Sequence, residues 1–340
     1  MNNIDAEKFY LASETIGKDI NLIQGAGGNT SYKEGESLIV KASGCKLKKA
    51  RQEKIFVNLN RNKIIKQLSK NDNDLEQSFE YEKIKLRPSI ETSMHAVIPH
   101  KYVFHVHCLN TLGLIVQEGF EVYLKDIFED LNYAIIKYVK PGISLAKEIS
   151  KVFSNSIPDV LFLSNHGLVV GGEDLDKIIE KIYFISNKLK NNKKEYKKLN
   201  HHSLENLSIN SLFRPTSFLE AHQLAASKRS INIASSGSLY PDHVVFLGPS
   251  TLSINNISEF NDLNYFFNNK KKLPVIIYKD LGVLVPKDIS YEAEEMVLAL
   301  SRVVSNIPEN SKINYLTKFQ ENELINWPAE TYRFKLNSLN

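Results

Sequence analysis

The sequence predicts an α/β protein with two domains. Segments with helical periodicity alternate along the chain with short apolar runs of β type. A polar stretch at about residues 190–215 has little apolar pattern and interrupts this alternation. A chain of 340 residues is also long enough for two modest hydrophobic cores. We therefore expect one domain over residues 1–200 and a smaller α/β domain over residues 210–340.

The elements of the first domain follow from apolar spacing and turn residues. Apolar side chains recur at helical spacing after Asp5, and Pro88 and Ser89 suit the first turn of another helix. Residues 50–86 are charged and mixed, and predict a strand and a helix with an exposed loop at about 71–77. The remaining expected elements are a helix at 5–20, a glycine-rich turn at 25–31, strands at 37–43 and 102–108, a strand–turn–strand unit at 160–172 and an amphipathic helix at 173–190.

The second domain is expected to contain a helix at 217–229, a strand at 243–248, a strand pair and a long helix. Residues 160–185 and 275–300 align with each other, and both predict strand, glycine turn, strand and helix. Leu281 stands in the second segment where His166 stands in the first. This similarity indicates either a duplicated unit that lost one polar residue or a common local pattern.

Composition excludes several classes of protein. The 43 basic and 39 acidic residues leave a net charge of only +4, too balanced for a nucleic-acid binder. The basic run Lys190–Lys198 is expected to be a solvated helix end or linker, with an anion-binding patch as the alternative. No apolar run is long enough to span a bilayer, and the N-terminus lacks a signal-peptide layout. Two cysteines make no disulfide framework, so we expect a cytoplasmic protein without a membrane partner.

Three histidines form the strongest chemical signal. His105 and His107 alternate on a predicted strand, so their side chains are expected on one face. His166 lies beside Gly167 at a strand-to-turn corner, from which a side chain can project. Three imidazoles with an open position are typical of a catalytic zinc site. Taken singly, each histidine is also compatible with a strand or turn residue that binds nothing.

Glu91 is the candidate acid–base residue, because a carboxylate near a divalent ion can accept a proton or bind the ion. The alternative is an exposed residue that complements the helix dipole. His95 lies one helical turn later, and either supports the site or is simply a buried polar residue. The turn at 25–31 and the Ser43-Gly44 pair offer backbone N–H groups and small side chains that suit an anion.

Five short motifs together resemble the class II aldolase/adducin family. They occur in the family's order within residues 5–190, and are GGNTS (27–31), KASG (41–44), PSIETSMH (88–95), HVHC (105–108) and SNHGLVVGG (164–172). The layout is most similar to the aldolase region of bifunctional rhamnulose-1-phosphate aldolase/dehydrogenases, without the dehydrogenase.

The resemblance implies a three-layer α/β/α sandwich around a mostly antiparallel sheet. It implies a divalent metal, most often Zn²⁺ with Mn²⁺ or Co²⁺ as alternatives, bound by His105, His107 and His166, with Glu91 as acid–base residue. It also implies a homo-oligomer, often a tetramer. The residues that it assigns to the substrate phosphate are Gly28, Asn29, Ser43, Gly44 and Ser89.

The activity that the resemblance implies is aldol cleavage of a ketose, as a sugar phosphate, through a metal-stabilised enediolate. Dehydration, decarboxylation and 4-epimerisation occur on the same site in the family, although the epimerases carry Asp where Glu91 stands. Ile90 stands where fuculose-phosphate aldolases have a second serine. Tyr123 lies in a plausible stretch for an acid contributed to a neighbouring subunit, but no motif fixes it. An adducin-like interaction module without a working metal site is the alternative of another class.

Overall fold

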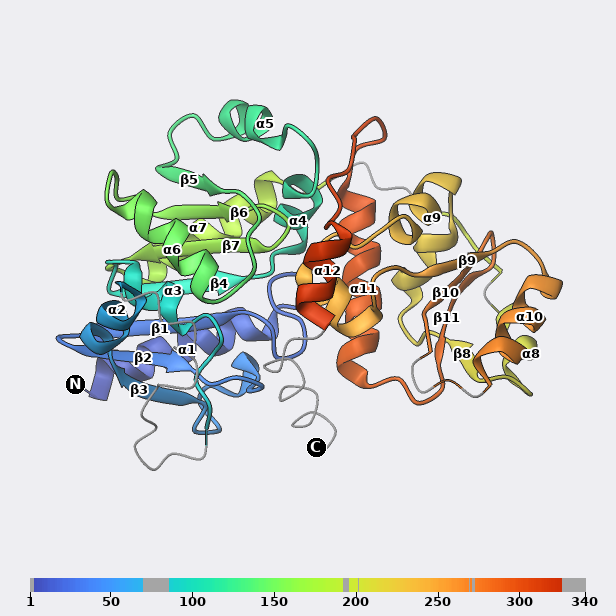
Figure 1. Cartoon of the computed structure of the whole chain (residues 1–340), viewed down its shortest axis with the longest axis horizontal. Coiled ribbons are helices and arrows are strands. Elements are labelled where there is room, and N and C mark those ends of the chain that lie inside the picture. Colours follow the sequence, from blue (N-terminus) through green and yellow to red (C-terminus); the bar gives the residue numbers. More distant parts are fainter. Residues whose placement is uncertain are drawn as a thin grey trace. The chain divides into compact units, whose positions relative to one another are not determined.

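The computed structural model in Figure 1 describes residues 3–69, 86–191, 196–200, 202–268, 270 and 273–325. The loop expected at 71–77 and part of the basic run at 190–198 lie outside these residues. The chain divides into two compact units. Within the described residues, the first unit comprises the chain up to Thr111 and Gly119–Lys188, and the second comprises Leu112–Glu118 and the chain from Leu189. The domain limits expected from the sequence stay a prediction.

A seven-stranded sheet forms the centre of the first unit, in the order β3-β2-β1-β4-β7-β6-β5. Every neighbouring pair is antiparallel except β5 and β6, which are parallel. The mostly antiparallel sheet expected for this unit is therefore confirmed. Its strands are β1 (Asn29–Glu34), β2 (Ser37–Lys41), β3 (Phe56–Asn60), β4 (Tyr102–Val106), β5 (Tyr133–Ile136), β6 (Val160–Leu163) and β7 (Gly167–Gly172).

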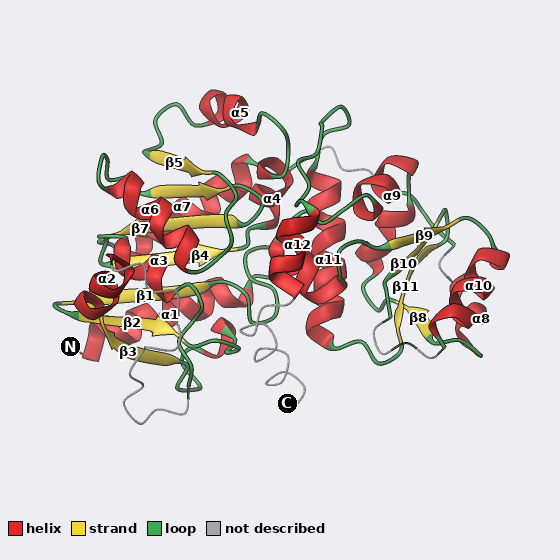
Figure 2. Cartoon of the chain, viewed as in Figure 1, coloured by secondary structure: helices red, strands yellow, loops and turns green. Residues whose placement is uncertain are grey.

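Helices lie on both faces of this sheet, which makes three layers (Figure 2). The helices are α1 (Asn3–Lys18), α2 (Arg61–Ser69), α3 (Thr92–Val97), α5 (Phe120–Ile127), α6 (Ile143–Phe153) and α7 (Leu175–Lys188), with a 3₁₀ turn at Leu47–Lys49. Helix α4 (Leu109–Ile115) begins in the first unit and ends in the second. Helices α1 and α7 pack together on one face, and α2, α3 and α6 pack on the other. The predicted three-layer α/β/α sandwich is confirmed.

The side chains of β4 alternate between the two faces of the sheet, and this alternation decides the face on which His105 lies. Tyr102 and Phe104 lie on the α1 face, where both rings pack against Phe9. Val103 lies on the opposite face, in the apolar core shared with α3 and α6. Because successive strand residues point to opposite faces, His105 shares the face of Val103. The sequence of β4 thus directs an imidazole towards α3.

The second unit has a four-stranded sheet in the order β8-β11-β10-β9. The strands are β8 (Phe213–Pro215), β9 (Leu252–Ile254), β10 (Ile276–Tyr278) and β11 (Gly282–Pro286). The helices are α8 (Ser203–Ser208), α9 (Lys228–Ser235), α10 (Ile257–Phe267), α11 (Tyr291–Asn306) and α12 (Lys318–Ile325). This smaller α/β unit agrees with the expected class, and its core includes Phe213, Ile276 and Leu284.

Two local predictions in the second unit are wrong. Residues 243–248 are not a strand, because His243–Leu247 forms a buried π-helical turn. A short apolar run with β-branched residues is compatible with either structure, and burial on all sides favoured the helical one here. The single helix expected at 217–229 is instead a 3₁₀ helix at Leu219–Ala225, followed by α9, which Ser227 caps by accepting a hydrogen bond from the Ser230 N–H.

The two sheets share a connectivity. Strands β4, β5, β6 and β7 are arranged 4-7-6-5, and β8, β9, β10 and β11 are arranged 8-11-10-9. The strand directions match, since β5 with β6 and β9 with β10 are the parallel pairs. The turn before the last strand also matches, because Asn165 and Asp280 both adopt positive φ, at 52° and 62°. The sequence similarity between 160–185 and 275–300 therefore corresponds to one shared local architecture.

None of the helices in the described ranges is long and apolar enough to cross a membrane.

Candidate active site

Three imidazoles converge at the end of β4. His105 is the penultimate residue of β4, His107 follows the strand directly, and His166 lies in the turn between β6 and β7. The pairs of ring centroids are 4.8 to 5.4 Å apart. One nitrogen from each ring lies within 4.8 Å of the others, and all three residues are largely buried. The structure thus brings together the three histidines selected from the sequence, although His107 and His166 are 59 positions apart in the chain.

The turn at Asn165–Gly167 places His166. Asn165 has a φ of 52°, and asparagine adopts this left-handed conformation more readily than most residues. The His166 N–H donates a hydrogen bond to the Leu163 carbonyl at 3.0 Å, which closes the turn. A Cβ at Gly167 would lie 2.6 Å from the Val106 carbonyl oxygen and 3.2 Å from Cε1 of His105. Glycine is therefore required here by close approach of β4 and its imidazole.

The carboxylate of Glu91 faces these rings. Glu91 directly precedes α3, and its side chain is almost fully buried. Its Oε2 lies 3.4 Å from Nε2 of His105, and its Oε1 lies 3.4 Å from Nε2 of His166. No group in the described part of the chain donates a hydrogen bond to Oε1. Burial by itself raises the pKa of Glu91, but the three imidazoles and a hydrogen bond from Asn29 outweigh it, so the pKa is lowered.

These groups fit a divalent cation. The Nδ1 of His105 lies 3.2 Å from the Leu168 carbonyl, which can only accept, so Nδ1 carries the proton and Nε2 the lone pair. Nε2 of His107 lies 3.1 Å from that same Nε2. A buried carboxylate oxygen without a hydrogen bond completes the set. Imidazole nitrogens with a carboxylate oxygen are ligands that zinc accepts.

The glycine-rich turn and the Ser43-Gly44 pair lie beside this cluster. Gly28 has a φ of 57°, and a Cβ there would lie 2.8 Å from the His105 carbonyl oxygen. Asn29 pairs with His105 across β1 and β4. The Ser43 N–H donates to the Arg87 carbonyl, which brings the Ser43-Gly44 pair alongside the segment that carries Ser89.

The side chain of Asn29 contacts Glu91 rather than open space. Its Nδ2 lies 2.7 Å from Oε2 of Glu91 and 3.2 Å from Oγ of Ser89. Its Oδ1 accepts a short hydrogen bond from Nε2 of His95. Of the residues expected to bind phosphate, Asn29 thus bonds directly to the carboxylate, whereas the Ser89 hydroxyl accepts from Asn29 and from the backbone N–H of Glu91.

Sequence reasoning did not assign the supporting contacts of Ser31 and Lys41, although both residues lie within the motifs at 27–31 and 41–44. Ser31 lies on the same face of β1 as Asn29, and its Oγ is 2.7 Å from Nδ1 of His95. Lys41 is almost fully buried and donates to the carbonyls of Ala26, at 2.7 Å, and Cys45, at 2.8 Å, so it connects the glycine-rich turn to the Ser43-Gly44 loop. Ser31 is two residues from Asn29, and this spacing predicts that both side chains lie on one face of the strand. A lysine in a strand has no comparable pattern that predicts its burial.

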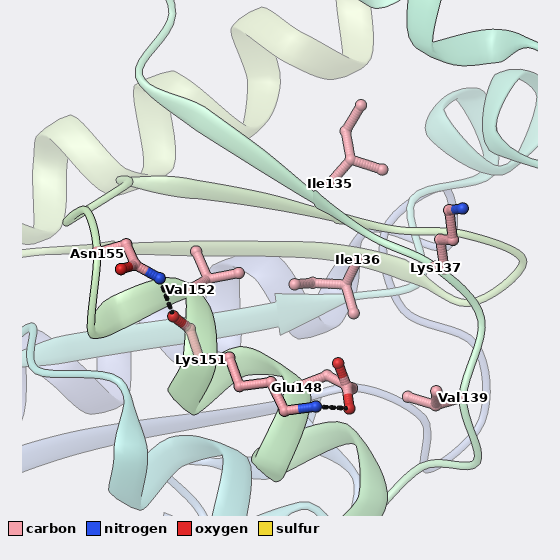
Figure 3. A pocket seen from close by; sticks show the side chains of 8 residues that line it. All are labelled: Ile135, Ile136, Lys137, Val139, Glu148, Lys151, Val152 and Asn155. Atoms are coloured by element: carbon pink, nitrogen blue, oxygen red, sulfur yellow. Dashed lines mark hydrogen bonds and ion pairs between the residues drawn. The ribbon is translucent and has the colours of Figure 1, made fainter.

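Tyr123 and a separate pocket lie outside this cluster. Tyr123 is on α5 with 54% of its surface exposed, and its expected role stays a prediction. A pocket of about 350 Å³ lies between the end of β5 and α6 (Figure 3). The Glu148–Lys151 ion pair, 2.7 Å long, forms part of its wall. None of the predicted site residues is among the described residues that line it, namely Ile135, Ile136, Lys137, Val139, Glu148, Lys151, Val152 and Asn155.

Comparison with known proteins identifies one family model, related sequences and similar solved structures. Residues 10–191 match the model of the class II aldolase and adducin N-terminal domain. An uncharacterised oxidoreductase of Bacillus subtilis, YuxG, is 28% identical over 191 residues, which are 52% of this chain but only 27% of that protein. The L-fuculose phosphate aldolase of Methanocaldococcus jannaschii is 27% identical over 172 residues, which are 46% of this chain and 78% of that enzyme.

Among solved structures, the N-terminal class II aldolase domain of a conserved Thermoplasma acidophilum protein has a TM-score of 0.48 and 26% identity. The similarity covers 54% of this chain and 92% of that domain. The family match spans more than half of the chain and contains all five motifs identified in the sequence. The chain therefore belongs to the class II aldolase and adducin family.

Proposed function

We propose that the first unit is a metal-dependent lyase that cleaves a ketose phosphate by a retro-aldol reaction and also catalyses the reverse condensation. The observation that carries this proposal is the buried cluster of His105, His107, His166 and Glu91. Its family includes the L-fuculose phosphate aldolase that matches 46% of this chain. Class II aldolases generally depend on a divalent metal, and the three imidazoles are the residues that would hold it.

A bound divalent cation supplies Lewis acidity at the oxygen atoms of the substrate's reacting end. Glu91 then has one task, which is to move a proton at the carbon next to the carbonyl. In the cleavage direction the hydroxyl that becomes the aldehyde gives up its proton to solvent as the C–C bond breaks, and protonated Glu91 then delivers one proton to the carbon next to the carbonyl. In condensation Glu91 removes that proton, and the new hydroxyl takes one from solvent. We assign this transfer to Oε1, to which no described group donates a hydrogen bond, because Asn29 already donates to Oε2.

The phosphate is proposed to bind at the turn of Gly28 and Asn29, the Ser43-Gly44 pair and Ser89. The Ser43 and Ser89 hydroxyls add short polar groups on the neighbouring segment, and Ile90 adds none. Four-epimerisation is less favoured than cleavage because Glu91 is not the aspartate of the epimerases.

The test is Glu91→Gln, which preserves shape and the contact with Asn29 but removes the proton acceptor. We expect metal content to be unchanged and turnover of a cleavable ketose phosphate to fall by at least ~100-fold, the usual scale for an acid–base group. Glu148→Gln, at an exposed carboxylate of the same unit, is the matched control. Near-normal turnover of the metal-loaded Gln variant would remove Glu91 from the mechanism.

Product identification separates the reactions that share this type of site. An aldolase releases two carbonyl fragments, a dehydratase one product and water, a decarboxylase carbon dioxide, and an epimerase an isomer of the substrate. Zinc rather than another metal, a homotetramer, a role in carbohydrate metabolism and a cytoplasmic location are parts of the same proposal. A chain without affinity for zinc, cobalt or manganese would favour the adducin-like interaction module.

We also propose that the second unit is a degenerate repeat of part of the first. His105 pairs with Val169 across β4 and β7, and the equivalent pair of the second sheet is Pro215 with Leu284. By the same alignment Leu281 replaces His166 and Ser217 replaces His107. None of the three imidazoles is retained, which supports assigning the metal chemistry to the first unit.

A further inference from the structure

We propose that Ser31, His95 and Asn29 form a buried hydrogen-bond relay that fixes the orientation of the Glu91 carboxylate towards the three histidines. His95 and Asn29 act in it as positioning residues. The catalytic role of this relay rests on the proposed function, whereas its hydrogen bonds do not depend on which substrate is cleaved.

The relay is continuous from β1 to the carboxylate. Ser31 Oγ lies 2.7 Å from Nδ1 of His95, and Nε2 of His95 contacts Oδ1 of Asn29 at hydrogen-bond distance. Nδ2 of Asn29 lies 2.7 Å from Oε2 of Glu91. All four side chains are buried, with at most 5% of any residue exposed. Strand β1 supplies Ser31 and Asn29, and α3 supplies His95 one turn after Glu91.

The direction of each proton follows from what each atom can do. An ionised carboxylate only accepts, so Nδ2 of Asn29 donates to it and Oδ1 must face His95. That oxygen also only accepts, which places a proton on Nε2 of His95. His95 is fully buried, and burial disfavours the charged form of an imidazole, so the ring is neutral and Nδ1 is left as an acceptor. The Ser31 hydroxyl then donates to Nδ1.

This arrangement has a single self-consistent orientation. A flipped Asn29 amide would present its oxygen to the Glu91 carboxylate and its NH₂ to the Nε2–H of His95, so both contacts would be repulsive. A buried network with every member satisfied is rigid, whereas a partly satisfied one is costly. The relay therefore leaves Oε2 of Glu91 fixed and leaves Oε1 directed at the imidazoles.

Kinetics of four variants test the relay. His95→Leu removes the donor to Asn29, and we expect kcat to fall by about 10- to 100-fold, as for groups that orient a metal site, while KM and metal content stay within twofold. His95→Gln restores an N–H near the position of Nε2 and is expected to recover most of kcat. Asn29→Asp, which cannot donate to Glu91, should lose kcat like His95→Leu. His100→Leu is the matched control, because His100 bonds to the Pro158 carbonyl and not to this network.

The tautomer of His95 gives a readout that does not depend on activity. In ¹⁵N-detected NMR of the full chain, the His95 signals should report a protonated Nε2 and an unprotonated Nδ1 with or without zinc. Ser31→Ala should shift the Nδ1 resonance and leave the Nε2–H in place. The relay is overturned if the proton lies on Nδ1, or if His95→Leu folds, retains metal and keeps wild-type kcat. If the wild type cleaves no ketose phosphate, the proposed function fails while the tautomer still decides the relay.

Discussion

Gly167 offers the sharpest test of how the site is built, because its role is steric and separate from acid–base chemistry. Its φ is not in the left-handed region, so alanine meets no backbone penalty there. The added Cβ would lie 2.6 Å from the Val106 carbonyl oxygen and 3.2 Å from Cε1 of His105. The obstacle is the backbone of Val106, which is in the last pair of the β4–β7 ladder and cannot rotate away as a flexible side chain would.

The size of the effect follows from these distances. A comfortable non-bonded separation is about 3.5 Å, so relief of the contact requires the two strands to separate by about 0.9 Å near His105. Metal–ligand distances tolerate only about 0.2 Å of variation, so His105 and His166 can no longer converge on one ion without further adjustment. We expect Gly167→Ala to weaken zinc affinity by about 10- to 100-fold and to cost about 1–3 kcal/mol of stability from overpacking.

The assay is competition for zinc against a chromophoric chelator, together with the absorption spectrum of the cobalt-substituted protein. Gly35→Ala is the matched control, since Gly35 has a φ of 58° and no atom lies within 4 Å of its added Cβ. That variant should lose about 1 kcal/mol through backbone strain alone and keep wild-type zinc affinity. Unchanged affinity and an unchanged cobalt spectrum in Gly167→Ala would refute the packing argument.

Two further predictions concern buried charged side chains outside the histidine cluster. Glu294 accepts bonds from both Arg214 NH groups at 2.9 and 2.7 Å, so Glu294→Gln should lower the free energy of unfolding at pH 7 by about 3 kcal/mol in urea titrations. Burial raises the pKa of Glu294, but its hydrogen bonds outweigh burial and lower the pKa to about 2. The difference in unfolding free energy between wild type and Glu294→Gln should therefore shrink as the pH falls from the ordinary pKa of 4.5 towards 2. A difference that persists at low pH would contradict this reasoning. Burial lowers the pKa of Lys33 from 10.5 to about 7, so between these pH values the unfolded chain binds more protons than the folded one. The unfolding free energy of the wild type should therefore rise with pH in this range relative to that of Lys33→Met. Unfolding free energies that change with pH in the same way in both proteins would contradict the prediction.

Much of the first unit could be predicted from the sequence, because its motifs combine a local pattern with a fixed order. The family assignment and the three-layer sandwich are confirmed, and the structure gathers His105, His107, His166 and Glu91 at one place. Each histidine taken alone was ambiguous. A metal site is indicated only when the turn at Asn165–Gly167 is considered together with the strand at 102–108, because the two segments together supply all three imidazoles.

The partners of His95 could not be predicted in the same way. Helical spacing placed His95 on the face of Glu91, but spacing gives no information about a strand distant in sequence. The β1–β4 register, in which Asn29 is opposite His105, decides that Asn29 and Ser31 face α3. Sheet register depends on which strands become neighbours, and this is a property of the whole fold.

In the second unit, the strand pair β10–β11 could be predicted from the sequence, whereas the structure of residues 243–248 could not. The run at 243–248 has the composition of a strand but forms a π-helical turn, and the strand beside β10 is instead β9, at Leu252–Ile254. The pair β10–β11 was predictable, because Asp280 and Gly282 reproduce the turn that Asn165 and Gly167 make in the first unit. The turn depends on local backbone conformation, which a few residues encode, whereas the choice between strand and helix for a short buried run depends on its surroundings. For the same reason the turn can survive the loss of the imidazole: Leu281 keeps the backbone path of His166 while removing the chemistry.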